Sequence, residues 1–138
     1  MKKTSQNGFS LLELLVVMVI IGIIAVVGTP YFQRAVESAE NGNSFSLMRS
    51  ISTAQMTYYS QHRRYALLKE LNSDQKGVFG TTQGEIVRHG KFRLEMTPTV
   101  PSDEELKTTY EITATRSYGD IPYLITVNQS GKITQVLP

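Results

Sequence analysis

The sequence contains no cysteine and no tryptophan, and it has only two histidines. The absence of cysteine excludes a disulfide framework, a thiolate metal site and cysteine catalysis. His62 and His89 lie far apart in the sequence, each beside a basic residue, and neither has the spacing of a metal ligand. The fold must therefore be stable without covalent cross-links.

Neither positive nor negative charge predominates in the sequence. The 14 basic and 12 acidic residues leave a formal net charge of +2, and Lys and Arg form no stripe, so a nucleic-acid partner is not indicated. Residues 103–105 are acidic but lack the regularly spaced oxygen ligands of a calcium loop. No nucleophile elbow, phosphate loop or dinucleotide fingerprint is present. The 138 residues suffice for one small domain, and we expect neither an enzyme nor a cofactor.

One segment has no charged residue at all, between residues 14 and 32. Together with residues 9–13 it forms an apolar stretch long enough to cross a membrane as a helix, which takes about 20 residues. Residues 1–8 (MKKTSQNG) are polar and basic, so the N-terminus should remain in the cytoplasm and the remainder should face outward. The stretch is longer than a secretory signal and is followed by no Ala-x-Ala cleavage site.

Glu13 interrupts this apolar stretch between two leucines. An acidic residue at the centre of a membrane span costs about 2.5–3.5 kcal/mol, and less near its end. A carboxylate in such a place is usually retained for a partner. Glu13 therefore either reaches the lipid headgroups or pairs with a cation on a neighbouring subunit.

The residues around Glu13 carry a specific resemblance. Residues 8–13 (Gly-Phe-Ser-Leu-Leu-Glu) resemble the class III signal of type IV pilins and the related pseudopilins. The resemblance implies that a prepilin peptidase removes the leader, residues 1–8, by cutting after Gly8, and then N-methylates Phe9. It also implies that Glu13 pairs with the N-terminus of a neighbouring subunit and that Pro30 bends the helix. Residues 9–32 would then serve as both transmembrane and polymerisation helix.

The remainder of the chain predicts an α+β fold. Apolar residues spaced by three or four continue the helix as an amphipathic segment over residues 33–60, with a weak point for a kink at 41–43. Residues 61–138 should form a globular head. Within it we expect a helical turn over 66–71, a loop over 72–84, a turn or loop over 100–107, a turn over 128–131, and strands over 91–97, 109–116, 123–127 and 132–137. Three to four antiparallel strands should pack on the second half of the helix.

The function predicted first is a structural subunit of a type IV pilus that polymerises into a surface filament for adhesion, motility or DNA uptake. A pseudopilin of a type II secretion system or a minor pilin is the alternative, although major pseudopilins usually carry a C-terminal tryptophan that this chain lacks. A monomeric, single-span anchored binding domain is a third interpretation. The expected partners are copies of the chain, the prepilin peptidase, an inner-membrane assembly platform and, before assembly, membrane lipid. The expected location is the inner membrane first and the cell surface after assembly.

Overall fold

The computed structural model describes residues 8–116 and 122–136. The leader lysines and the last residue of the strand expected over 132–137 lie outside the described residues. The chain divides into two compact units, Met1–Glu40 and Asn41–Pro138, and each is described by itself.

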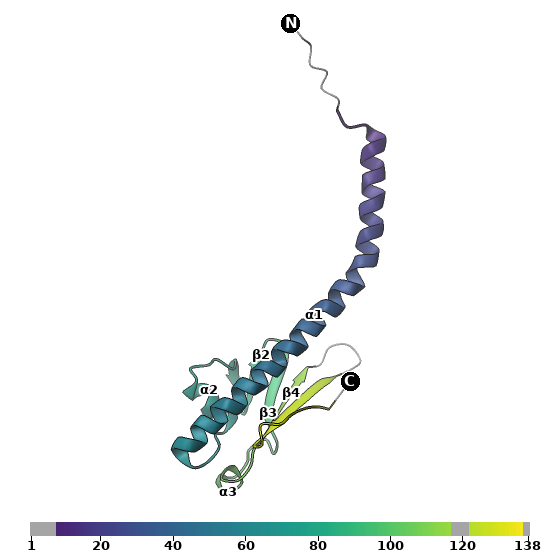
Figure 1. Ribbon diagram of the computed structural model, residues 1–138. Helices are drawn as coiled ribbons and strands as arrows, with labels where there is room; N and C mark the ends of the chain where they lie inside the picture. Colours follow the sequence, from purple (N-terminus) through teal and green to yellow (C-terminus); the bar gives the residue numbers. More distant parts are fainter. Residues whose placement is uncertain (1–7, 117–121, 137–138) are drawn as a thin grey trace. The chain divides into compact units, whose positions relative to one another are not determined.

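One helix, α1 (Leu11–His62), passes through both units (Figure 1). The predicted continuous helix from residue 9 to about residue 60 is therefore confirmed to within two residues at each end. The weak point at 41–43 is helical, and these three residues do not interrupt the assigned helix. The favourable packing of the residues that follow them offsets the low helix propensity of glycine and asparagine.

The second unit contains an antiparallel sheet in which each strand pairs with the next along the chain. The expected α+β class is confirmed, but the expected number of strands is too low, because the described residues form a sheet of six. The strands are β1 (Thr81–Gln83), β2 (Ile86–His89), β3 (Phe92–Met96), β4 (Glu111–Arg116), β5 (Tyr123–Asn128) and β6 (Ile133–Gln135).

The two additional strands are β1 and β2, and β1 lies within the segment expected to be a loop. β1 has three polar residues, all exposed, so it carries no apolar alternation. The two hairpins are instead indicated by glycines in their turns. Gly84 and Gly90 have φ of +63° and +57° and allow the tight turns that join β1 to β2 and β2 to β3.

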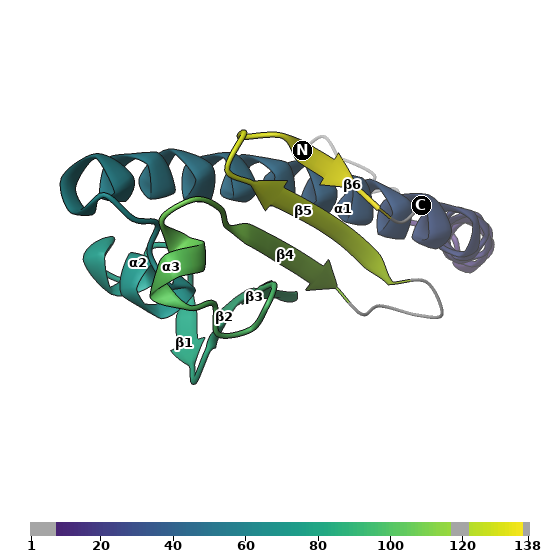
Figure 2. The same cartoon turned by 90° about the horizontal axis from the view of Figure 1, so that it is seen from below.

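The core of the second unit lies between the sheet and the later turns of α1 (Figure 2). Buried residues alternate with more accessible ones along β3 and β5, as predicted, whereas β4 buries three consecutive residues. Apolar side chains from one face of α1, from the sheet and from two short helices meet there. The largest of those that are almost completely buried are Met48, Ile51, Leu68, Leu71, Val87, Leu94, Leu106, Ile112, Ile125 and Val127. The prediction that the sheet packs on the second half of the helix is confirmed.

The two short helices are α2 (Leu68–Asp74) and α3 (Asp103–Leu106). α2 begins and ends later than the helical turn expected over 66–71, and α3 occupies a segment expected to be a turn or loop. A capping box starts α3, because Ser102 Oγ accepts from the Glu105 N–H (3.3 Å) and Glu105 Oε2 accepts from the Ser102 N–H (2.8 Å). The Ser-x-x-Glu spacing was present in the sequence as the signal for this helix.

A buried glutamine fixes the chain where it leaves α1. Gln55 is fully buried, its Nε2 donates to the Ala66 carbonyl (2.9 Å), and its Oε1 accepts from the Ala66 N–H (2.8 Å). Replacing Gln55 by leucine leaves both backbone groups without partners, at about 1–3 kcal/mol for each unsatisfied group. We expect the free energy of unfolding to fall by about 2 kcal/mol or more.

Urea denaturation of the full chain in detergent, followed by tyrosine fluorescence, measures this effect. Gln61→Leu is the matched control, because Gln61 is exposed on the same helix and its replacement should change stability by about 0.5 kcal/mol or less. Equal midpoints for the two variants would contradict the role of Gln55.

An ion pair joins the segment that follows α1 to α2. Arg64 Nη1 and Nη2 donate to the two carboxylate oxygens of Glu70 (2.9 and 3.0 Å), and Glu70 also accepts from the Leu67 N–H (3.0 Å). These interactions, the Arg64 hydrogen bond first, lower the pKa of Glu70 below its usual value of 4.5.

Because the pKa of Glu70 is lower in the folded state, its ionised form contributes stability that is fully present above the unfolded pKa near 4.5 and is lost as the pH falls through the folded pKa. Glu70→Gln should therefore lower the free energy of unfolding at pH 7, and the difference from wild type should shrink below about pH 4.5. Denaturation curves at pH 7 and pH 3 check this. A difference that is the same at both pH values would show that the charge of Glu70 does not contribute.

Candidate functional site

The first turn of α1 is capped by one of the predicted site residues, Glu13, together with Ser10. Ser10 precedes the helix, and its Oγ accepts from the Leu12 N–H (3.3 Å). Glu13 Oε2 accepts from the Ser10 N–H (2.9 Å). Ser10 and Glu13 thus satisfy two backbone donors at the start of the helix. We call this reciprocal pair the capping box, although the Ser10 hydroxyl accepts from the second helical N–H and not from the third. This role of Ser10 and Glu13 was not predicted, although the Ser-x-x-Glu spacing indicates it.

The capping box occupies only part of the Glu13 carboxylate. A carboxylate has two oxygens and accepts several hydrogen bonds, so one donor leaves capacity for another partner. Across residues 8–116 and 122–136, no basic side chain forms an ion pair with Glu13. The helix N-terminus favours the negative charge, but none of the described residues places a cation against it.

The predicted new N-terminus lies close to this carboxylate. Phe9, Glu13, Leu14 and Val17 line a small hollow of about 240 Å³ on the helix surface. The structure therefore brings two predicted site residues, Phe9 and Glu13, to one place, with apolar side chains around them. Pro30 lies more than four turns further along α1.

Gly8 is exposed and lies outside the helix, in irregular backbone. A Cβ atom added to it would meet nothing within 4 Å. The folded chain itself therefore does not require glycine at this position for space. A requirement for glycine here would have to come from a molecule that approaches the backbone.

The apolar stretch of α1 is exposed along its whole length in the single chain. Every residue from 9 to 32 is exposed, and an 18-residue window has a mean hydropathy of 3.0. By length and composition this part of α1 suffices to cross a membrane. So much exposed apolar surface is unfavourable in water, so lipid or other protein must cover it.

Pro30 lies inside α1, and the helix continues on both sides of it. Proline has no backbone N–H, so the carbonyl of Val26 lacks its usual helical donor. The neighbouring Thr29 Oγ1 donates to the Ala25 carbonyl (2.7 Å). The bend expected at Pro30 stays a prediction.

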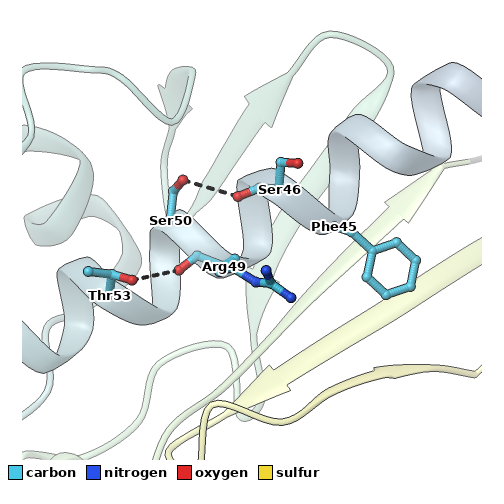
Figure 3. Close-up of a pocket in the computed structure, with 5 residues that line it drawn as sticks. All are labelled: Phe45, Ser46, Arg49, Ser50 and Thr53. Carbon is cyan, nitrogen blue, oxygen red and sulfur yellow. Dashed lines mark hydrogen bonds between the residues drawn. The ribbon is translucent and has the colours of Figure 1, made fainter.

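A second exposed helix face lies in the other unit. Phe45, Ser46, Arg49, Ser50 and Thr53 line a shallow hollow on α1 (Figure 3). Ser50 Oγ donates to the Ser46 carbonyl (3.0 Å), and Thr53 Oγ1 donates to the Arg49 carbonyl (3.0 Å). These hydroxyl protons are satisfied within the helix, so this face can be covered without losing their hydrogen bonds.

The histidines show no arrangement for chemistry. His62 Nδ1 lies 3.2 Å from the Tyr58 carbonyl oxygen, and His89 Nδ1 lies 3.2 Å from the Phe79 carbonyl oxygen. In the described part of the chain, no group of three or more His, Asp or Glu side chains is placed to hold a metal ion. The features that stand out are thus the capped helix start, the exposed apolar helix and the accessible Gly8–Phe9 junction.

Comparison with known proteins identifies the same region. Residues 3–29 match the model of the prokaryotic N-terminal methylation motif. This chain has the N-terminal motif of the type IV pilin family. It is 38% identical over 60 residues to the fimbrial protein EcpC of Eikenella corrodens and 33% identical over 70 residues to a fimbrial protein of Moraxella nonliquefaciens. It is also 32% identical over 61 residues to the type IV major pilin protein PilA of Myxococcus xanthus.

The similarity to these pilins is partial. The three matches cover 44%, 51% and 44% of this chain, and the chain spans 39%, 46% and 28% of the respective relatives. No solved structure matches the chain. The resemblance to type IV pilins based on residues 8–13 is confirmed, whereas the roles of individual residues in assembly stay predictions.

Proposed function

We propose that this chain is the structural subunit of a type IV pilus, held in the membrane by the first half of α1 before assembly and joined to other copies through the same helix afterwards. The observation that carries the proposal is the complete exposure of the apolar helix over residues 9–32. A membrane covers that surface before assembly, and a bundle of identical helices covers it afterwards.

Processing by a prepilin peptidase prepares the chain for transfer of its apolar helix from the membrane to the bundle. Cleavage between Gly8 and Phe9 removes Lys2 and Lys3, which would otherwise hold the N-terminus at the cytoplasmic surface. The capping box begins at Ser10, so it survives the cut and the mature helix keeps its start. The accessible backbone at Gly8 supports this position of the cut.

Cleavage also creates the cation that Glu13 lacks. The new α-amine on Phe9 keeps its positive charge after methylation, and it is a compact donor. In a dry bundle, a carboxylate and an amine from adjoining copies neutralise each other, whereas either one alone would be strongly unfavourable. That no cation among the described residues pairs with Glu13 supports a partner on another copy.

Close packing of the helices follows from the small residues of the apolar stretch. A Cβ atom added to Gly22 or Gly28 would meet nothing within the chain, so these glycines serve no packing inside one copy. Small residues allow membrane helices to approach closely. The missing hydrogen bond at Pro30 would let α1 bend as it fits against its neighbours.

The proposed partners are therefore other copies of the chain, the prepilin peptidase, an inner-membrane assembly platform and membrane lipid before assembly. Shearing cells that express the full chain, followed by electron microscopy and antibody labelling, tests the filament. Labelled surface fibres in the sheared fraction support a pilus subunit. Retention of the processed chain in the membrane would favour a pseudopilin or minor pilin, and an unprocessed chain in the membrane would favour a monomeric anchored domain.

A further inference from the structure

We infer that Asn128 is an acceptor for an N-linked sugar, which a glycosyltransferase attaches at the turn between β5 and β6. Residues 128–130 read Asn-Gln-Ser, and Asn-x-Ser with x other than proline is the spacing of an N-glycosylation acceptor. Such acceptors are used on surface loops of exported proteins. The inference goes beyond the proposed function and shares with it only the outward position of the head.

The motif occurs once in the sequence. The other four asparagines, at positions 7, 41, 43 and 72, are followed two residues later by Phe9, Asn43, Phe45 and Asp74. A motif of three residues also arises by chance, so the structure around Asn128 has to show that a transferase can reach and use its side chain.

The motif forms a closed turn at the surface. The Gly131 N–H donates to the Asn128 carbonyl (2.9 Å), and Gly131 has φ of +72°, a conformation that favours glycine. Residues 129–132 are all exposed, and the turn joins β5 to the edge strand β6 (Figure 2). A transferase can therefore approach this turn without opening the sheet.

The carboxamide of Asn128 has its oxygen occupied and its nitrogen available. Oδ1 accepts from the Ser130 N–H (3.1 Å) and from the Ser130 hydroxyl (2.6 Å), and these two donors fix which end of the carboxamide is oxygen. Within residues 8–116 and 122–136, Nδ2 makes no hydrogen bond and is not among the buried polar atoms that lack a partner. Nδ2 is the atom that would carry the sugar.

Asn128 lies on the outer face of β5. Side chains alternate along this strand, so Tyr123, Ile125 and Val127 face the core and Asn128 faces away from it. Its direct partner on β4, Glu111, is exposed. A sugar on Nδ2 would therefore extend from the head into solvent and displace no core side chain.

The transfer balances with a donor in which the anomeric carbon of the sugar is bonded to a diphosphate. The Nδ2 lone pair forms the new bond to that carbon, and the bond from the carbon to the diphosphate oxygen breaks. The diphosphate leaves with the electron pair, and Nδ2 gives one of its two protons to a base on the transferase. The two donors of Ser130 assist, because they point at Oδ1, where negative charge develops as Nδ2 loses its proton.

A purely structural role would also use the hydrogen bonds between these two residues, because asparagine and serine side chains stabilise turns in this way. That role requires only the oxygen of residue 128, whereas an acceptor requires its nitrogen. Asn128→Asp separates the two roles, because aspartate keeps oxygens that accept from Ser130 but has no Nδ2.

Mass spectrometry of the full chain, purified from the cells that produce it, tests the acceptor. Trypsin releases residues 117–132 as one peptide, and we expect that peptide to carry a sugar that fragmentation locates on residue 128. The sugar should be lost in Asn128→Asp and in Ser130→Ala, and it should be retained in Ser130→Thr, which keeps the hydroxyl. Asn43 is the internal control, because it is exposed but lacks the motif and should carry no sugar.

Each other outcome has a defined meaning. An unmodified peptide from the processed chain would overturn the inference, and so would a sugar on Ser130 or aspartate at position 128 without a sugar. A single increment of several sugars would identify a lipid-linked donor, and a series of one-sugar increments would identify nucleotide-linked donors; both results support the acceptor. A glycosylated chain that is never cleaved after Gly8 would contradict the proposed function and leave this inference standing.

Discussion

Replacing Glu13 by glutamine is expected to reduce filament assembly at least about tenfold while the chain still inserts in the membrane. Glutamine keeps an oxygen that can accept from the Ser10 N–H, so the capping box and the start of α1 should survive. It removes the negative charge, so the amine of the adjoining copy would be buried without its partner, which is strongly destabilising. The yield of sheared filaments, relative to the amount of chain in the membrane, measures the effect.

Two further variants distinguish the effect of the Glu13 charge from the effect of the helix cap. Glu13→Val removes both and should also insert but assemble poorly. Ser10→Ala removes only the hydroxyl that accepts from the Leu12 N–H, at a cost of about 1 kcal/mol to the helix start, and should assemble well above the level of the Glu13 variants. Normal filament yield from Glu13→Gln would contradict the pairing role. Loss of filaments in Ser10→Ala, with normal yield from Glu13→Gln, would instead show that assembly depends on the helix cap.

Replacing Gly8 by valine is expected to block processing and to leave a precursor that carries Lys2 and Lys3. The added side chain meets nothing within 4 Å in the chain itself, so the folded protein should not be disturbed. It would instead obstruct the peptidase, which must approach the backbone on both sides of the cut. A gel shift and an immunoblot of membranes give the ratio of precursor to mature chain, and we expect almost all of it to be precursor.

The size of the substituted residue provides the control. Gly8→Ala adds a single methyl group and should be processed more slowly than wild type but more completely than Gly8→Val. Accumulation of the mature chain in Gly8→Val at the wild-type level would show that the cut lies elsewhere. The retained leader would also keep the backbone nitrogen of Phe9 in a peptide bond, so it could not form the charged α-amine that Glu13 requires. Filaments should therefore be absent from cells that express Gly8→Val.

The parts of the fold that could be predicted are those with a sustained pattern. α1 follows from an uninterrupted apolar stretch and then from apolar residues spaced by three or four. β3 and β5 follow from alternation that the buried face of the sheet imposes. β1 has no such pattern, because all its residues are exposed and only the glycine turns mark the hairpin. Its place in the sheet depends on pairing with β2, which a local reading of the sequence does not reveal.

The candidate site also has parts that the sequence predicts and parts that it does not. Gly8, Phe9 and Glu13 were found from a contiguous motif in which each residue type has a chemical reason. The capping contact between Ser10 and Glu13 was equally local but was masked by the unusual position of a carboxylate in an apolar segment. The pairing of Arg88 with Arg93 could not be predicted, because these residues become neighbours only through the register of β2 against β3.

Mass spectrometry of the N-terminal peptide, from sheared extracellular material and from membranes, tests the central claim most directly. The account predicts a peptide that begins at N-methylated Phe9 in the sheared fraction, which would place the processed chain in a surface filament. The same peptide found only in membranes would contradict the pilus subunit and favour a pseudopilin or minor pilin. A peptide that begins at Met1 or Lys2 in both fractions would contradict processing and polymerisation together.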